Sequence, residues 1–214
     1  MKANTTILVA DDHPMLLKGL TDELAANGYQ VLPGATNGAE ALQLLTDSQP
    51  DIAILDIEMP LLSGFEVIKK AREKNQQTRF IILTSHKEKA FVMRAKKLDI
   101  QGYLLKDEPF SEVDACIEAV MQGENYFSHT FDHIFTTQIS PQLEKIKFLS
   151  PSERTIVRLI AQNKTSKEIG EALSISHRTV QKHRANIINK LDLPPVTDAL
   201  TQWTTENKEL VLSL

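Results

Sequence analysis

Short apolar runs alternate with amphipathic stretches along the first 123 residues. The apolar runs, which we expect to be strands, cover residues 7–10, 31–35, 52–56, 80–84 and 102–106. The stretches that follow them repeat apolar residues every three or four positions, which predicts helices over 14–26, 38–45, 63–74, 87–98 and 109–121. Such alternation builds a parallel sheet with helices on both faces. The pattern therefore predicts a doubly wound α/β domain with a five-stranded parallel sheet.

From residue 149 onward the pattern becomes entirely helical. We expect helices over residues 150–162, 166–173, 177–191 and 196–207. Ser150 and Pro151 are typical of a helix start, and Asn163 can take the left-handed conformation that ends a helix. A short helix, a tight turn and a longer basic helix are typical of a helix-turn-helix. The chain thus predicts a second, small all-α domain over 148–214 behind a first domain over 1–123.

Residues 124–147 differ from both predicted domains because their aromatic residues lie among Ser, Thr, His and Gln. We interpret this stretch as a linker with a partial helix, whose aromatic side chains pack on a neighbouring domain. His129 and His133 are spaced like two metal ligands on a helix, but no third ligand is evident. We therefore do not expect a metal at this pair.

Charge is distributed unevenly along the chain, although the net charge is only −4. Residues 1–125 hold 13 basic and 19 acidic residues, whereas residues 150–191 hold 8 basic and 3 acidic ones. A basic second domain suits phosphate groups, and a solvated charged surface is the plain alternative. The chain has one cysteine, Cys116, no apolar run of about 18 residues and no signal-peptide pattern at its start. We expect a cytoplasmic protein without disulfides, a Cys-rich zinc site or a membrane span.

Polar side chains follow four of the predicted strands at their carboxyl ends. They are Asp11, Asp12, Asp56, Thr84 and Lys106. In a parallel sheet these ends meet at one edge, so three carboxylates would repel one another unless a cation joined them. Oxygen ligands suit Mg²⁺, and a carboxylate beside Mg²⁺ can attack a phosphoryl group to form an acyl phosphate.

Residues 5–123 resemble the receiver domain of bacterial response regulators. The resemblance is carried by Asp11-Asp12, Asp56 in Asp56-Ile57-Glu58-Met59-Pro60, Thr84-Ser85, and Lys106 in Leu104-Leu105-Lys106-Asp107. It implies that Asp56 is the phosphoacceptor and that Asp11, Asp12, Asp56 and the backbone carbonyl of Glu58 organise Mg²⁺ or Mn²⁺. It also implies that Lys106 binds the phosphoryl group and that Thr84 and Tyr103 form a switch pair. The Glu58 side chain could instead tune dephosphorylation.

The second domain resembles the LuxR-type helix-turn-helix, so the whole chain resembles a response regulator of the NarL/FixJ class. The resemblance is carried by Leu149-Ser150-Pro151-Ser152-Glu153-Arg154, Ser166-Lys167-Glu168-Ile169-Gly170, Leu173-Ser174-Ile175-Ser176, Thr179-Val180-Gln181-Lys182-His183 and Asn186-Ile187-Ile188-Asn189-Lys190-Leu191. It implies base contacts from Gln181, Lys182 and Ala185, and phosphate contacts from Lys167, Thr179, His183 and Lys190. His183 could also be a surface imidazole without partners.

The last predicted helix carries an apolar stripe of Val196, Ala199, Leu200 and Trp203. The resemblance implies that this helix pairs two copies of the chain on a two-fold DNA site. The alternative is that the stripe packs only on its own domain.

These features favour a two-component response regulator whose phosphorylation at Asp56, by a cognate histidine kinase, controls dimerisation and binding to double-stranded DNA. We do not expect an enzyme, beyond slow self-dephosphorylation. One alternative is a Mg²⁺-dependent phosphatase or phosphotransferase with Asp56 as its nucleophile. Another is a constitutive DNA-binding protein whose first domain only dimerises. The clustered carboxylates and Lys106 argue against the latter, because a scaffold has no use for them.

Overall fold

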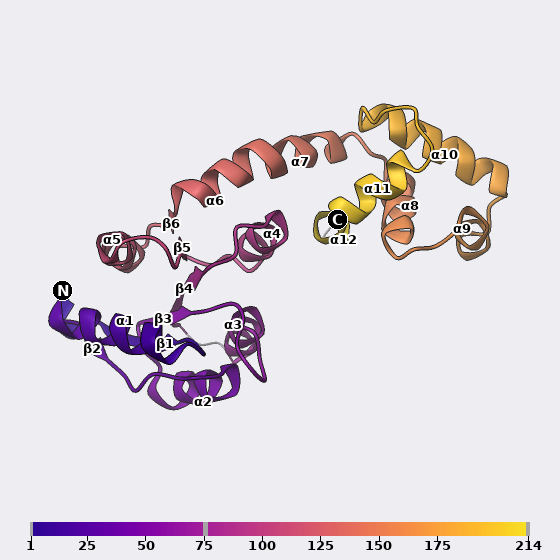
Figure 1. Cartoon of the computed structure of the whole chain (residues 1–214). Coiled ribbons are helices and arrows are strands. Elements are labelled where there is room, and N and C mark those ends of the chain that lie inside the picture. The colour runs from indigo at the N-terminus through magenta and orange to yellow at the C-terminus, as the bar shows by residue number, and fades with distance from the viewer. Residues whose placement is uncertain (1, 75–76, 213–214) are drawn as a thin grey trace. The chain divides into compact units, whose positions relative to one another are not determined.

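The computed structural model of the chain describes residues 2–74 and 77–212. Met1, residues 75–76 and residues 213–214, which the predicted domains include, lie outside the described residues. The chain divides into two units, Met1–Asp132 and His133–Leu214, and each is described by itself (Figure 1).

The first unit is built on a parallel sheet with the strand order β2-β1-β3-β4-β5-β6. The strands are β1 (Thr6–Ala10), β2 (Gln30–Val31), β3 (Ile52–Leu55), β4 (Arg79–Thr84), β5 (Gly102–Leu105) and β6 (Tyr126–Phe127). The parallel sheet is confirmed, but the predicted number of five strands is wrong. The sixth strand, β6, has only two residues, too few for an apolar pattern, and it lies in the predicted linker.

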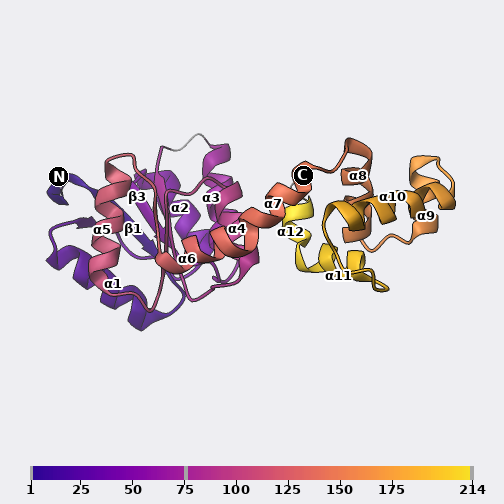
Figure 2. The same cartoon turned by 90° about the horizontal axis from the view of Figure 1, so that it is seen from above.

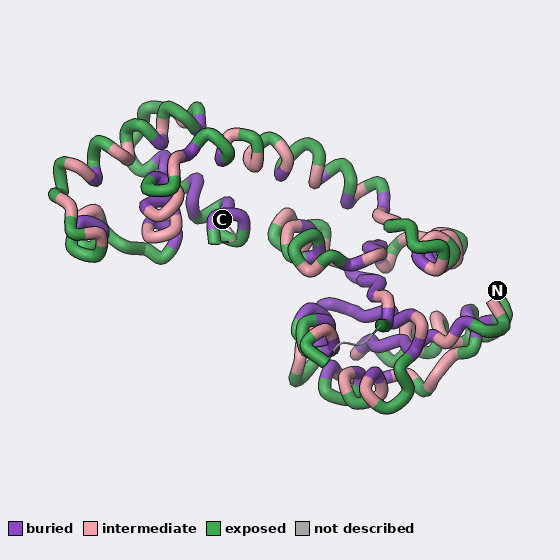
Figure 3. The backbone as a smooth tube through the Cα atoms, turned by 180° about the vertical axis from the view of Figure 1, so that it is seen from behind, coloured by how far each residue is buried: buried purple, intermediate pink, exposed green. Residues whose placement is uncertain are grey.

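Helices cover both faces of this sheet, as predicted. They are α1 (Pro14–Ala26), α2 (Gly38–Ser48), α3 (Gly64–Glu73), α4 (Lys89–Lys97) and α5 (Phe110–Met121), after a short helical turn η1 (Lys2–Asn4). Helices α1 and α5 lie on one face, and α2, α3 and α4 lie on the other (Figure 2). Because both faces are covered, β3 and β5 are buried along their whole length, while the helices expose their outer sides (Figure 3).

The order in which the chain adds strands to the sheet changes direction at β1. The chain runs from β1 outward to β2 and then returns to the other side of β1 with β3. In open α/β sheets, the functional site usually lies at the carboxyl ends of the strands beside such a change of direction. The parallel arrangement brings the residues after β1, β3, β4 and β5 to this one edge.

The second unit is helical throughout its described part. After α6 (His129–Ile134), within which the two units divide, the chain forms a π-helical turn η2 (Phe135–Ile139) and α7 (Ser140–Lys147). The following helices are α8 (Pro151–Ala161), α9 (Ser166–Leu173), α10 (His177–Lys190), α11 (Ala199–Glu206) and α12 (Lys208–Leu212). None of the described helices in either unit combines the length and apolar character needed to cross a bilayer.

Side-chain caps start the three helices that carry the helix-turn-helix pattern. Ser150 and Thr165 each form a capping box, and Ser176 accepts a hydrogen bond from the Thr179 amide. Asn163 has the expected left-handed conformation, with φ of 62°. The last predicted helix begins three residues later than expected, at Ala199, because Asp198 adopts a left-handed conformation with φ of 67°.

Gly64→Ala is expected to destabilise the first unit by about 1–3 kcal/mol. The Gly64 amide donates to the Ile57 carbonyl at 2.9 Å, and a Cβ at residue 64 would collide with the backbone carbonyl oxygen of Asp56. The control is Gly19→Ala inside α1, where a Cβ meets no atom within 4 Å. It should stabilise the protein by about 0.5–1 kcal/mol, because alanine favours a helix. Urea denaturation followed by circular dichroism measures both, and equal effects of the two substitutions would contradict the steric role of Gly64.

Lys190→Met is expected to destabilise the second unit by about 1–3 kcal/mol. Lys190 Nζ lies 2.7 Å from Glu153 Oε2, and the Glu153 side chain is only 4% exposed. Losing the lysine leaves a buried carboxylate unpaired, although the 39% exposure of Lys190 keeps the cost below that of a fully buried pair. Lys182→Met, on the exposed side of the same helix, is the matched control. Fluorescence of Trp203, the single tryptophan, follows unfolding of this unit, and indistinguishable midpoints would refute the expectation.

Candidate functional site

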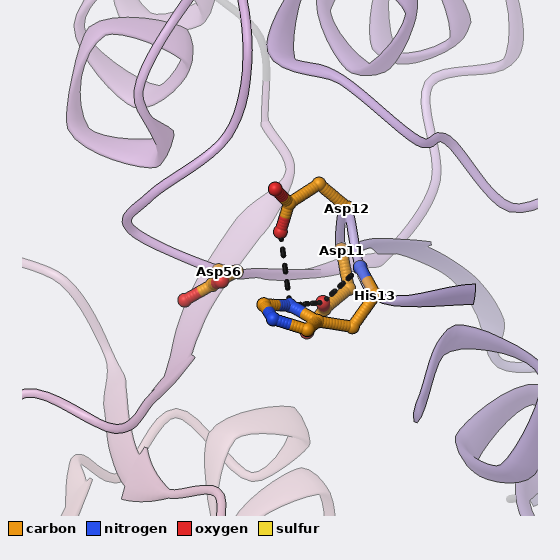
Figure 4. A group of neighbouring side chains, drawn as sticks. All are labelled: Asp11, Asp12, His13 and Asp56. Atoms are coloured by element: carbon orange, nitrogen blue, oxygen red, sulfur yellow. Dashed lines mark hydrogen bonds and ion pairs between the residues drawn. The ribbon is translucent and has the colours of Figure 1, made fainter. Parts of the chain in front are cut away.

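Four polar residues meet at the carboxyl edge of the sheet. Asp11, Asp12 and His13 follow β1, and Asp56 follows β3. One potential ligand atom from each of the four lies within 4.8 Å of those of the others, and Figure 4 shows the three carboxylates with the imidazole beside them. The convergence of the three aspartates follows from the parallel order of β1 and β3.

Lys106 joins two of these carboxylates. Its Nζ lies 2.7 Å from Asp56 Oδ2 and 2.8 Å from Asp11 Oδ2. The other oxygen of Asp56 accepts the Ile57 amide at 2.7 Å. All three side chains are 10% exposed or less, so little solvent screens the ammonium from the carboxylates.

Burial and charge act in opposite directions on this group. Burial raises the pKa of Asp56 above its ordinary value, and the hydrogen bond from Lys106 offsets only part of this effect. Burial by itself would lower the pKa of Lys106, but hydrogen bonds to Asp11 and Asp56 outweigh it, so the pKa is raised. The lysine is therefore held as a cation, while the cluster carries excess negative charge.

The cluster offers what a divalent cation with oxygen ligands requires. Asp12 Oδ1 is buried and has no hydrogen-bond partner among the described residues. His13 Nδ1 lies 3.0 Å from this oxygen, but it also lies 3.1 Å from Asp11 Oδ1, to which it is hydrogen-bonded. A buried carboxylate oxygen without a hydrogen bond is costly unless a cation pairs with it. The donor set thus fits a hard metal ion such as Mg²⁺.

Thr84 and Tyr103 are connected through the loop that follows β4. The His86 amide donates to Thr84 Oγ1 at 3.2 Å, and the Tyr103 hydroxyl donates to the His86 carbonyl at 2.8 Å. Thr84 is fully buried and Tyr103 is 1% exposed. Burial raises the pKa of Tyr103, which keeps its hydroxyl protonated as a donor. The two residues predicted as a switch pair therefore share a partner.

The Glu58 side chain points to this same loop. Its Oε1 lies 3.1 Å from His86 Nε2, and the side chain is 71% exposed. The His86 ring also stacks on Phe91, with the ring centroids 4.2 Å apart. The predicted role of the Glu58 carbonyl as a metal ligand stays a prediction.

In the second unit, α10 has the exposed polar face that was expected. Gln181, Lys182 and Ala185 are exposed, and Arg178 shares their helical face by its spacing. Val180 and Ile187 are buried on the opposite side. This helix can therefore present amide and cationic groups to a ligand without disturbing its own core.

The predicted phosphate contacts fall into two groups. Lys167 and Lys190 are exposed, although Lys190 is paired with Glu153. Thr179 and His183 are half-buried. His183 lines a cavity of about 240 Å³ together with residues of α8, α9 and the turn after α9, which are Ser152, Thr155, Ile156, Leu173 and Ile175. His183 is thus partly turned toward its own unit.

The apolar stripe predicted to pair two copies is mostly buried within the second unit. Ala199, Leu200 and Trp203 are 7%, 1% and 6% exposed, and only Val196, at 59%, lies on the surface. Trp203 Nε1 donates to Gln142 Oε1 of α7 at 3.0 Å. The stripe is therefore explained by packing within the second unit, and three of its members offer little surface to a second copy.

Sequence reasoning missed two residues of the first site, His13 and His86. His13 directly follows the aspartate pair, so its position could have suggested it. Arg178, one turn before Lys182, counts among the basic residues of its helix in the sequence but was not predicted as a DNA contact. His86 had no local signal, because its contacts with Glu58 and Tyr103 depend on the tertiary fold. His129 and His133 do not belong to the one group of potential metal ligands found among the described residues.

Asp56→Asn is expected to stabilise the protein in metal-free buffer, by an amount that grows as the pH rises above 3.8, the ordinary pKa of an aspartate. Because the folded state raises the pKa of Asp56 above 3.8, it binds the proton more tightly than the unfolded chain does, and the wild type loses stability as this proton leaves. Asparagine cannot ionise, so the variant escapes this loss.

Urea denaturation with EDTA across this pH range measures the difference in unfolding free energy. Asp107→Asn is the control, because the hydrogen bond from Lys87 lowers the pKa of Asp107, so its small effect has the opposite sign. A stabilisation by Asp56→Asn that is independent of pH would disprove that folding raises the pKa of Asp56.

Two protein-family models match the chain. The response regulator receiver domain matches residues 7–118, and the LuxR family of bacterial regulatory proteins matches residues 147–201. The first match spans the acidic cluster and Lys106, and the second spans α8, α9 and α10.

Curated relatives match along most of their length. The transcriptional regulatory protein DesR of Bacillus subtilis (strain 168) is 31% identical over 92% of this chain and 95% of its own. The nitrate/nitrite response regulator protein NarL of Escherichia coli (strain K12) is 30% identical over 95% of this chain and 96% of its own.

Solved structures agree with this result. A LuxR-family DNA-binding response regulator from Staphylococcus aureus is 31% identical, covering 54% of this chain and 98% of that one, with a TM-score of 0.53. RcsB from Salmonella typhimurium shows the same fold, with a TM-score of 0.70 at 22% identity over 94% of this chain and 100% of its own. The chain belongs to the response regulators that join a receiver domain to a LuxR-type helix-turn-helix DNA-binding domain and act in transcription.

Proposed function

We propose that Asp56 accepts a phosphoryl group and that this modification controls DNA binding by the second unit. The observation that carries the proposal is the ammonium of Lys106, which lies 2.7 Å from Asp56 and 2.8 Å from Asp11. It supplies fixed positive charge next to the oxygen that would attack phosphorus, where negative charge develops.

In the proposed step, a carboxylate oxygen of Asp56 attacks the phosphorus of the donor. The P–N bond of a kinase phosphohistidine, or the P–O bond of a small acyl phosphate, breaks with its electron pair leaving on the donor. Asp11, Asp12, Asp56 and the Glu58 carbonyl would hold Mg²⁺ or Mn²⁺, which supplies charge neutralisation when bound. The Thr84 hydroxyl would donate to a phosphoryl oxygen, and Lys106 would pair with another.

For DNA binding we propose that α10 enters the major groove. Its exposed face offers Gln181, Lys182 and Ala185 to base edges, while Lys167, Thr179, His183 and Lys190 would contact phosphates. We further propose a homodimer on a two-fold site with Val196 at its contact. RcsB, whose solved structures have the same fold, has been seen as dimers bound to DNA, which supports this proposal. We also propose that a cognate histidine kinase phosphorylates the protein and that the protein is cytoplasmic.

Incubation with acetyl phosphate and Mg²⁺ tests the central step. Intact-protein mass spectrometry should show one added phosphoryl group in the wild type and none in Asp56→Asn. Asp107→Asn, which removes an exposed aspartate next to Lys106, should be modified like the wild type. EDTA should abolish the gain in mass. Equal modification of wild type and Asp56→Asn would overturn the assignment of the acceptor.

A further inference from the structure

The segment after α5 returns to the sheet and attaches to the strand that carries Tyr103. β6 pairs with β5 in the register Tyr103↔Phe127, and the Ser128 amide donates to the Tyr103 carbonyl at 2.9 Å. On the α5 side, the Tyr126 hydroxyl donates to Glu112 Oε2 at 2.6 Å. Residues 126–131, here named the clamp segment, thus belong to the first unit although the sequence indicated a linker.

One aromatic ring of the clamp segment lies against the ring of Tyr103, and a second stacks on the first. The Phe131 ring lies on Tyr103 with the centroids 4.9 Å apart, and the Phe127 ring stacks on Phe131 at 4.6 Å. Phe131 and Tyr103 are each 1% exposed. On the outer side, Lys96 Nζ from α4 lies 3.9 Å above the Phe127 ring, a cation–π contact.

The backbone fixes the position of Phe131. Ser128 Oγ accepts a hydrogen bond from the Phe131 amide at 3.2 Å, which caps the start of α6. The same Ser128 donates its own amide to Tyr103. The position of the Phe131 ring is therefore tied to β5 through a single buried residue.

We propose that the clamp segment holds the Tyr103 ring in its buried position, with Phe131 as the positioning residue, so that docking of the segment and burial of Tyr103 form one coupled equilibrium. Moving the ring outward would break its hydrogen bond to the His86 carbonyl and uncover Phe131. Releasing the segment would in turn uncover the ring. The contact between Phe131 and Tyr103 forms only when the segment is docked and the Tyr103 ring is buried. Docking and burial therefore favour each other by the same free energy.

This coupling gives the chain a route from the phosphorylation site to α6. His86 contacts Thr84 through its amide and Tyr103 through its carbonyl, and Tyr103 contacts the clamp segment, which continues directly into α6. The role of this route in signalling rests on the proposed phosphorylation of Asp56. The coupling itself does not, and it exists in the unmodified protein.

Fluorine NMR of the full chain labelled with 3-fluorotyrosine tests the effect of the segment on Tyr103. The protein has three tyrosines, so Tyr→Phe variants assign the three resonances. Phe131→Ala should shift the Tyr103 resonance toward that of a solvent-exposed tyrosine, and Phe131→Leu should shift it less. Phe148→Ala is the matched control, because Phe148 is 72% exposed. An unchanged Tyr103 resonance in folded Phe131→Ala or Phe131→Leu would overturn the proposal.

Hydrogen exchange tests the reverse direction. Tyr103→Leu should accelerate exchange of the Ser128 amide by about two- to tenfold, as the loss of one aromatic contact predicts. The amides of β1, away from the clamp segment, should exchange at the rate of the wild type. Unchanged exchange at Ser128 would refute the coupling. No phosphodonor is present in either experiment, so their outcome is independent of whether Asp56 is phosphorylated.

Discussion

The repulsion among three carboxylates at one edge of the sheet is the constraint on which the site depends. Asp11, Asp12 and Asp56 converge because β1 and β3 are parallel neighbours. The buried ammonium of Lys106 bridges Asp11 and Asp56, but a buried oxygen of Asp12 has no hydrogen-bond partner in the part of the chain that the structure describes. The remaining negative charge makes the site suited to a divalent cation and, with it, to a phosphoryl group. The suitability of the site for a divalent cation follows from the excess of three carboxylates over one ammonium.

Much of this arrangement could be predicted from the sequence. Apolar runs that end in Asp11-Asp12, Asp56 and Lys106 show both the strands and the edge at which these side chains meet. The capping pattern at Ser150 and the left-handed Asn163 mark helix boundaries in a purely local way. Such signals can be recognised in a single sequence because the residues that interact lie within a few positions of each other in the chain.

Features that depend on distant partners could not be predicted in this way. β6 is two residues long and becomes a strand only because β5 offers a free edge. The stripe containing Leu200 and Trp203 has the spacing of a contact surface, but packing within the second unit buries it. Lys190 stays a predicted phosphate contact, but its pairing with Glu153, thirty-seven positions away in the chain, had no local signal in the sequence. Apolar periodicity shows that a face is covered without showing what covers it.

The central claim is that the state of Asp56 sets the affinity of the second unit for DNA. Its most direct test is fluorescence anisotropy on a duplex that the protein itself selects from a random pool, with and without acetyl phosphate and Mg²⁺. For the wild type we predict that phosphorylation changes the affinity for DNA by about fivefold or more, because fivefold is the lower end of the effects that one site usually has on binding at another. Asp56→Asn should bind equally under both conditions. An identical response of the two proteins would contradict the claim.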